Sequence, residues 1–171
     1  RQFARRVEGS KREANDYISP NYVHEHGGEL EKERRVGNTF AKGETVSVGG
    51  SWIGERGFAG IAYTNRQNQY GLPGHSHEYE SCTVSGNLLI GCGEEDYGDE
   101  HETGPWVDLK SERYDFRTEI LNPIAGFEKL RAHASYTDYQ HDEIEGDSVA
   151  TTFKSKGYDA RLEMVHQPIA D

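Results

Sequence analysis

The sequence predicts an all-β protein built as an antiparallel meander. Three observations carry this prediction. Several stretches alternate apolar and polar residues with a period of two, the composition is poor in core-forming residues but rich in glycine and aromatics, and long connections alternate with short ones. Together they predict one curved sheet with a polar face and a thinly apolar face.

Composition and charge narrow the class of protein. Hydrophobic residues make up 33% of the 171 residues, which is too little for a conventional core, yet the 20 glycines and an aromatic share of 11% are unlike a disordered chain. The formal net charge of −11 disfavours nucleic acid as a partner and favours cations. The sequence contains no run of about 18 apolar residues and so predicts no transmembrane helix. Strands of a membrane β-barrel have a weaker signal, the alternation of apolar and polar residues.

The first half of the chain is expected to hold three of the strands. Residues 3–14 form the first, although their alternation is poor. Residues 15–43 form a long polar connection, whose run 29–35 is either a helical turn or the tops of two strands, the second being favoured. Residues 46–52 alternate cleanly and lead through a tight turn at 54–57 into a returning strand at 58–70.

The second half repeats this arrangement after a long connection at 71–109. Residues 113–120 show the cleanest alternation and are expected to form a strand. The chain then turns at 122–126 and returns as a strand at 130–137. A third long connection is expected at about 141–155, followed by a last strand at 158–164. The charged side chains of the strand at 113–120 are expected to form cross-strand ion pairs: Arg113, Asp115, Arg117 and Glu119.

In an antiparallel meander, this order of connections places every long loop at one end of the sheet and every tight turn at the other. Outer-membrane β-barrels have this asymmetry, with long extracellular loops and short periplasmic turns. A soluble antiparallel sheet with one solvated face is the alternative. Six strands are too few to close a spanning barrel, and an open edge is unfavourable in lipid, so a barrel would require further strands from a longer chain.

The connection at 71–109 contains the residues with the clearest metal chemistry. His75 and His77 lie two apart, so an extended backbone points both imidazoles to the same side. Imidazole and carboxylate are ligands that zinc selects, and two imidazoles supply half of a tetrahedral shell. The candidate metal ligands are His75, His77, Glu78, Asp96, Asp99 and His101. The acidic run 94–102 also concentrates cations by its field, or is a solubilising charge block.

The two cysteines of the chain, Cys82 and Cys92, lie in the same connection. They are either thiolate ligands or a local disulfide, and an oxidising, surface-exposed compartment favours the disulfide. Closing so short a loop stabilises by roughly 2–3 kcal/mol in the chain-entropy model.

Four motifs in order resemble a known family: Trp-Ile-Gly-Glu-Arg-Gly-Phe at 52–58, Tyr-Gly-Leu-Pro-Gly-His-Ser-His-Glu-Tyr-Glu at 70–80, Pro-Trp-Val-Asp-Leu at 105–109, and Tyr-Gln-His-Asp-Glu at 139–143. The closing His-Gln-Pro-Ile at 166–169 fits the same pattern. The sequence resembles the TonB-dependent outer-membrane zinc receptors of Gram-negative bacteria, the ZnuD type. The resemblance covers nearly the whole chain from about residue 11.

This resemblance implies a 22-stranded outer-membrane barrel, plugged by an N-terminal domain, that imports zinc with energy relayed by the TonB complex. Residues 1–171 would then be a partial barrel wall without the plug, with its long loops outside the cell and its apolar face against outer-membrane lipid. The remaining zinc ligands would come from His101, from Asp96 or Asp99, or from the missing plug. Transport would need the rest of the barrel, whereas zinc capture at the loops is the part this chain could retain.

The remaining histidines carry weaker expectations. His24, His26 and His141 fall in predicted long connections and are either members of a low-affinity relay or free solvated imidazoles. His133 is expected on the polar face, and His166 near the end of a strand. Two other functions are alternatives: a soluble, surface-exposed metal-binding or antigenic β-module, and a zinc hydrolase. The hydrolase is disfavoured because no His-Glu-x-x-His spacing occurs.

Overall fold

Ten β-strands and no helix make up the described part of the chain. The computed structural model describes residues 2–26, 29–73, 83–86, 88–90 and 104–168, and for 21–33 and 88–90 it describes the backbone alone. Within these ranges, no helix is long and apolar enough to cross a membrane. The predicted all-β class is confirmed.

Six strands form one long antiparallel sheet whose order follows the chain. They are β1 (Gln2–Ala14), β4 (Ala41–Gly54), β5 (Gly57–Gly71), β8 (Trp106–Leu121), β9 (Phe127–Glu145) and β10 (Ser148–His166). The poorly alternating stretch at 3–14 is therefore a strand, as predicted. The sheet is open: in the described ranges β1 pairs with β4 alone and β10 with β9 alone, so each leaves one edge without a strand partner.

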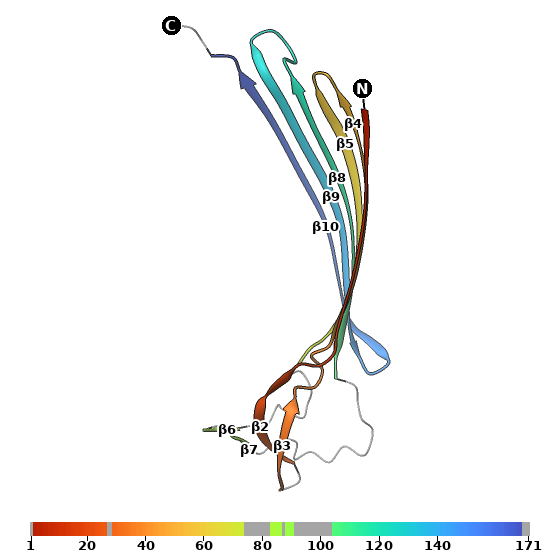
Figure 1. Ribbon diagram of the computed structural model, residues 1–171. Coiled ribbons are helices and arrows are strands. Elements are labelled where there is room, and N and C mark those ends of the chain that lie inside the picture. Colours follow the sequence, from red (N-terminus) through yellow and green to blue (C-terminus); the bar gives the residue numbers. More distant parts are fainter. Residues whose placement is uncertain (1, 27–28, 74–82, 87, 91–103, 169–171) are drawn as a thin grey trace.

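The two ends of the long sheet differ. The tight turns between β4 and β5 and between β8 and β9 lie at one end, together with both termini, and the longer excursions leave from the other end (Figure 1). The predicted asymmetry between short turns and long connections is confirmed for 54–57, 122–126 and the connections after β1 and β5. The second long connection ends earlier than predicted, because β8 already begins at Trp106.

A second, four-stranded sheet joins the two long connections to each other. It consists of β2 (Ile18–His26) and β3 (Glu29–Arg35) from the first connection and β6 (Thr83–Ser85) and β7 (Leu88–Ile90) from the second, in the order β3-β2-β7-β6. Residues 29–35 thus form a strand and not a helical turn. The link between the connections is a parallel pairing in which Val23 faces Leu88 and His24 faces Leu89.

The predicted long connection at 141–155 is wrong. Residues up to Glu145 continue β9, those from Ser148 begin β10, and the pairing runs through this whole region with His141 opposite Phe153. Gly146 makes the tight turn with a φ of 55°, which favours glycine. Polar residues dominate both faces of the strands here, so the sequence lacks the alternation that marks a half-buried strand.

The long sheet has a distinct apolar face. Because directly paired residues of antiparallel strands point to the same side, the register groups these side chains on one face: Phe3, Val7, Val48, Trp52, Ile61, Tyr63, Tyr114, Phe116, Tyr136, Tyr158, Leu162 and Met164. They are not buried against a second layer; Tyr158, Leu162 and Ile61 are 80%, 69% and 67% exposed. Among described residues Val107 is the buried hydrophobic side chain, at 2%.

A row of four tyrosines bounds this apolar face on the side of the long connections. Tyr63, Tyr114, Tyr136 and Tyr158 are register partners on consecutive strands, and their ring centroids are 5.0, 6.3 and 4.9 Å apart. The Tyr63 hydroxyl donates to Glu112 at 2.7 Å, and the Tyr136 hydroxyl donates to Asp138 at 3.2 Å. Both acceptors lie beyond the tyrosine row, where the same face becomes polar.

The opposite side of the sheet, here called the charged face, contains ion pairs along the whole length of the apolar face. Its rows alternate with those of the apolar face and contain Arg113, Asp115, Arg117, Glu119, Arg131, His133, Asp159, Arg161 and Glu163. The predicted division of the strand at 113–120 into a charged side and an apolar side is confirmed.

Candidate functional site

The metal ligands expected from the sequence lie outside the described residues. This holds for His75, His77, Glu78, Asp96, Asp99 and His101, and for both cysteines, Cys82 and Cys92. The structure instead shows how the two ends of the segment that contains them are held. Residues 73 and 104 mark these ends, and both lie at the end of the long sheet from which the excursions leave.

A single amide side chain clamps both ends of this segment. Asn38 Nδ2 donates to the carbonyl oxygen of Leu72 at 3.1 Å and to that of Pro105 at 2.7 Å. The backbone amide of Leu72 also donates to the carbonyl oxygen of Pro105, at 3.0 Å. The two ends of the segment between β5 and β8, at Leu72 and Pro105, are therefore held next to each other.

Two glycines make room for this clamp. A Cβ on Gly71 would lie 2.2 Å from the Asn38 carbonyl oxygen, and one on Gly104 would lie 2.7 Å from Asn38 Nδ2. Asn38 has a φ of 56°, a left-handed conformation that asparagine tolerates better than most residues. The clamp thus needs asparagine at one position and no side chain at two others.

The first long connection is anchored next to the clamp. Asp16 Oδ1 accepts a hydrogen bond from the backbone amide of Thr39 at 2.7 Å. The Thr39 hydroxyl accepts from the amide of Tyr17 at 2.9 Å and donates to the carbonyl of Val36 at 2.8 Å, while the Val36 amide donates to the Tyr17 carbonyl. These bonds close the base of the β2–β3 excursion.

We call the clamp and this closed base the loop collar; it consists of Asp16, Tyr17, Val36, Asn38, Thr39, Leu72 and Pro105. Both long connections begin and end at this collar. The parallel pairing of β2 with β7 links them a second time, in the small sheet. The backbone of His24 lies in that pairing, and His26 ends β2, so both histidines belong to the small sheet. The small sheet, with strands from both connections, lies at the end of the long sheet opposite the turns between β4 and β5 and between β8 and β9 (Figure 1).

The other histidines lie on the long sheet. His141 belongs to β9 and not to a long connection; its Nδ1 lies 2.8 Å from the Tyr139 hydroxyl, and its ring contacts Phe153 at a centroid distance of 4.6 Å. His133 is on the charged face, as predicted, and His166 ends β10. Within the described ranges, no three His, Cys, Asp or Glu side chains converge to hold a metal ion.

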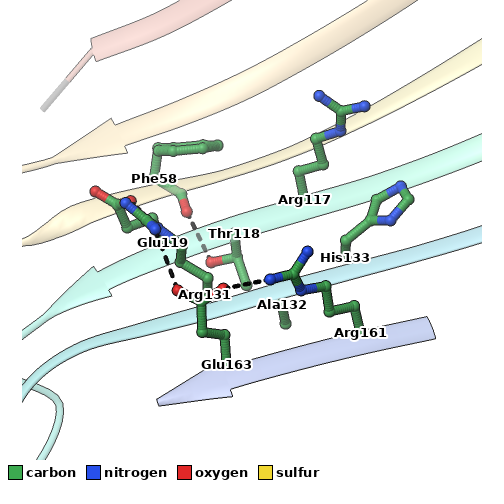
Figure 2. Close-up of a pocket in the computed structure, with 9 residues that line it drawn as sticks. All are labelled: Phe58, Arg117, Thr118, Glu119, Arg131, Ala132, His133, Arg161 and Glu163. Carbon is green, nitrogen blue, oxygen red and sulfur yellow. Dashed lines mark hydrogen bonds and ion pairs between the residues drawn. The ribbon is translucent and has the colours of Figure 1, made fainter. Parts of the chain in front are cut away.

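The predicted cross-strand ion pairs of β8 are correct in part. Glu119 pairs across strands with Arg131 at 2.8 Å, and Arg131 continues to Glu163 of β10 at 3.2 Å (Figure 2). Arg113, however, binds Asp115 on its own strand through two bonds of 2.8 and 2.9 Å. Residues two apart on a strand share a face, which makes this pairing possible.

The carboxylate of Asp142 joins β9 to β10 beyond the tyrosine row. Its Oδ1 accepts a bond from the Thr152 hydroxyl at 2.7 Å, and the Gln140 amide donates to both of its oxygens, at 2.9 and 3.2 Å. The Thr152 bond, followed by the Gln140 bonds, lowers the pKa of Asp142 below its ordinary value because both stabilise the charged form. This carboxylate therefore stays ionised to a lower pH than an aspartate without these hydrogen bonds.

Comparison with models of known protein families found none that matches this sequence.

The first prediction concerns the clamp. Replacing Asn38 by Asp keeps the size of the side chain and its tolerance for positive φ but removes the Nδ2 donor. We expect the amides of Gly71 and Leu72, which donate to Phe40 and Pro105, to exchange with solvent about tenfold faster in hydrogen-exchange measurements, because two bonds worth about 0.5–1.5 kcal/mol each are lost. The matched control is Asn65→Asp, in β5. Unchanged exchange in the Asn38 variant would contradict the clamp.

The second prediction concerns pH. A carboxylate whose pKa is lowered by folding adds stability above its unfolded pKa, and that stability is lost as the pH falls through the folded value. Replacing Thr152 by Val should raise the pKa of Asp142 toward the ordinary value, as measured by NMR titration of its side-chain carboxyl carbon. Thr151→Val is the control, because Thr151 is paired with Glu143 and points to the other face. Identical titration of Asp142 in both variants would refute the role of the hydroxyl.

Proposed function

We propose that this chain is part of the wall of a TonB-dependent outer-membrane zinc receptor, and that its long connections capture zinc outside the cell. The single observation that carries the proposal is the exposed apolar face of a one-layer sheet. Exposed contiguous apolar patches this extensive mark surfaces that another apolar phase or partner covers. Lipid is the covering phase that suits a sheet whose other face is charged.

The dimensions of the apolar face support lipid as the covering phase. On β10, it runs from the tyrosine row at Tyr158 to the strand end at His166, and residues 158–166 match the ~9–11 residues that a tilted strand needs to cross the hydrocarbon core. Thr118 lies on this face, and its hydroxyl donates to the Phe58 carbonyl at 2.7 Å, so it presents no unsatisfied donor. Arg5 on the edge strand is the charged exception, and its long stem allows the guanidinium to reach an interface.

The tyrosine row supports the orientation. Aromatic girdles lie at both interfaces of outer-membrane barrels, with the ring toward lipid and the hydroxyl toward water. The hydroxyls of Tyr63 and Tyr136 are bonded to carboxylates on the side of the long connections. We therefore assign that side to the extracellular space and the tight turns at 54–57 and 122–126 to the periplasm, which is the usual distribution of loop lengths.

The open edges of β1 and β10 support a larger barrel. Unpaired backbone groups at an edge cost several kcal/mol each in lipid, and spanning barrels need at least about eight strands. Further strands of a longer chain would therefore pair with both edges. The 22 strands, the plug and the coupling to the TonB complex follow from the resemblance of the motifs described above.

Zinc capture follows from the chemistry of the connections that leave the loop collar. His75 and His77 are the proposed primary ligands, with Glu78, Asp96, Asp99, His101 and the plug as sources of the remaining ones. The collar favours this role, because it fixes where both connections start and end and so lowers the entropy lost when their ligands close on an ion. Zinc is the transported cargo in this proposal, and no catalysis is involved.

The third prediction tests lipid contact. Replacing Ala160 by Arg puts a charge in the middle row of the apolar face, and we expect assembly into bilayers to weaken by about 2–4 kcal/mol, the cost of arginine at the lipid-facing midplane. The control, Ser135→Arg, adds the same charge to the charged face between Asp115 and Asp159. The free energy of folding in lipid vesicles measures both. Equal effects, or cooperative folding of the wild type without detergent or lipid, would favour a soluble β-module instead.

The fourth prediction tests zinc capture. Replacing His75 and His77 together by Ala should weaken zinc binding by well over tenfold in isothermal titration calorimetry, because half of a tetrahedral shell is removed. The control is His166→Ala, at the end of the long sheet opposite the loop collar. Anomalous scattering at the zinc edge would locate the bound ion directly. Equal affinity in the two variants would refute the assignment of these ligands.

A further inference from the structure

The charged face contains a row of three basic residues on consecutive strands. Arg117 of β8 is the register partner of His133 of β9, which is the register partner of Arg161 of β10. Directly opposed like charges destabilise a sheet unless other charges compensate them, and His133 adds to the charge of the two arginines when its ring is protonated. The row lies near the end of the sheet that contains the tight turns, and Figure 2 shows its three side chains on neighbouring strands.

Two members of this row are compensated by carboxylates. His133 lies between Asp115 and Asp159, with its Nε2 and Nδ1 each 3.3 Å from a carboxylate oxygen. Arg161 Nη2 binds Glu163 at 2.9 Å. The neighbouring Arg131 binds Glu119 and Glu163.

Arg117 is the member without compensation. The two carboxylates that flank it on its own strand are already engaged, Asp115 by Arg113 at 2.8 Å and Glu119 by Arg131 at 2.8 Å. In the part of the chain that the structure describes, Arg117 forms no ion pair and is exposed. The N–H donors of its guanidinium are therefore all available to a ligand.

The row borders a hollow that is large enough for a small molecule. The hollow is open to solvent and has a volume of ≈ 470 Å³, and three guanidinium groups line it against two carboxylates (Figure 2). Asp115 and Asp159 lie against His133 beside the hollow, so among the described residues that line it the positive charge that no carboxylate offsets is that of Arg117. Arg117 and Arg161 stand on strands two apart, so their backbones are roughly 10 Å from each other, and their long side chains can reach the two ends of one short ligand.

We propose that this hollow binds a small dicarboxylate, with Arg117, whose guanidinium donors are all available, holding one carboxylate and Arg161 holding the other through the donors that Glu163 leaves free. The guanidinium fork matches a carboxylate with two parallel hydrogen bonds and stays charged at all physiological pH values. His133, held between its two aspartates, spaces the two arms. The site is independent of zinc capture, because it lies on the sheet and uses none of the residues between 71 and 109.

The test measures succinate binding to the full chain folded in detergent micelles, without zinc and at constant ionic strength, by isothermal titration calorimetry. We expect succinate to bind at least fivefold more tightly than acetate, because acetate engages one arm, and Arg117→Gln to weaken succinate binding at least fivefold. Arg66→Gln is the matched control: Arg66 is on the same face, beyond the tyrosine row, and is likewise exposed. It should change the affinity less than twofold.

Four outcomes would overturn the proposal: no succinate binding up to about 10 mM, acetate binding as well as succinate, unchanged affinity in Arg117→Gln, or an equal loss in Arg66→Gln, which would indicate a general charge effect. If Arg117→Gln does not fold, Arg117→Lys keeps the charge and removes the fork. It should then bind succinate with an affinity lowered at least threefold, and wild-type affinity in this variant would also refute the site. Loss of zinc binding in the His75 and His77 variant leaves these results unaffected.

Discussion

Backbone hydrogen bonding between neighbouring strands is the interaction on which this structure depends. Within the described ranges, the long sheet has no second layer to pack against, and Val107 is the buried hydrophobic side chain. The continuous antiparallel pairing from β1 to β10 satisfies the donors and acceptors of the inner strands. Side-chain burial adds stability only when another phase covers the apolar face, which is why the sheet's physical environment decides whether it is a stable fold.

Geometry at the long-connection end follows from the same sheet. Because the strands of the long sheet are antiparallel and in register, β1 and β5 end, and β4 and β8 begin, close together there. Asn38 uses this proximity by bonding to two carbonyls that lie 34 and 67 residues away in the sequence. Long excursions are thereby reduced to closed loops with fixed bases, a common way in which a rigid scaffold presents binding residues.

The two faces of the long sheet differ in their content of charged and polar groups. On the apolar face, polar groups are few, and the Thr118 hydroxyl is bonded to the backbone. On the charged face, carboxylates and guanidinium groups form chains of pairs that run across β8, β9 and β10. Exposed pairs of this kind contribute little stability individually, so their value lies in shaping a polar surface, on which Arg117 is left available.

The sequence by itself determined the strands whose two faces differ, because alternation with a period of two records which side is apolar; residues 113–120 are the clearest case. It also determined the tight turns at 54–57 and 122–126, through glycine and proline. It identified the histidines and carboxylates with metal chemistry, whose assembly into a site stays a prediction. It failed at 141–155, where both strand faces are polar and no alternation exists to read. Only the tertiary structure decided the strand register, the tyrosine row, the Asn38 clamp and the open fork of Arg117. Each of these depends on contacts between residues far apart in the chain, and local sequence patterns contain no information about such partners.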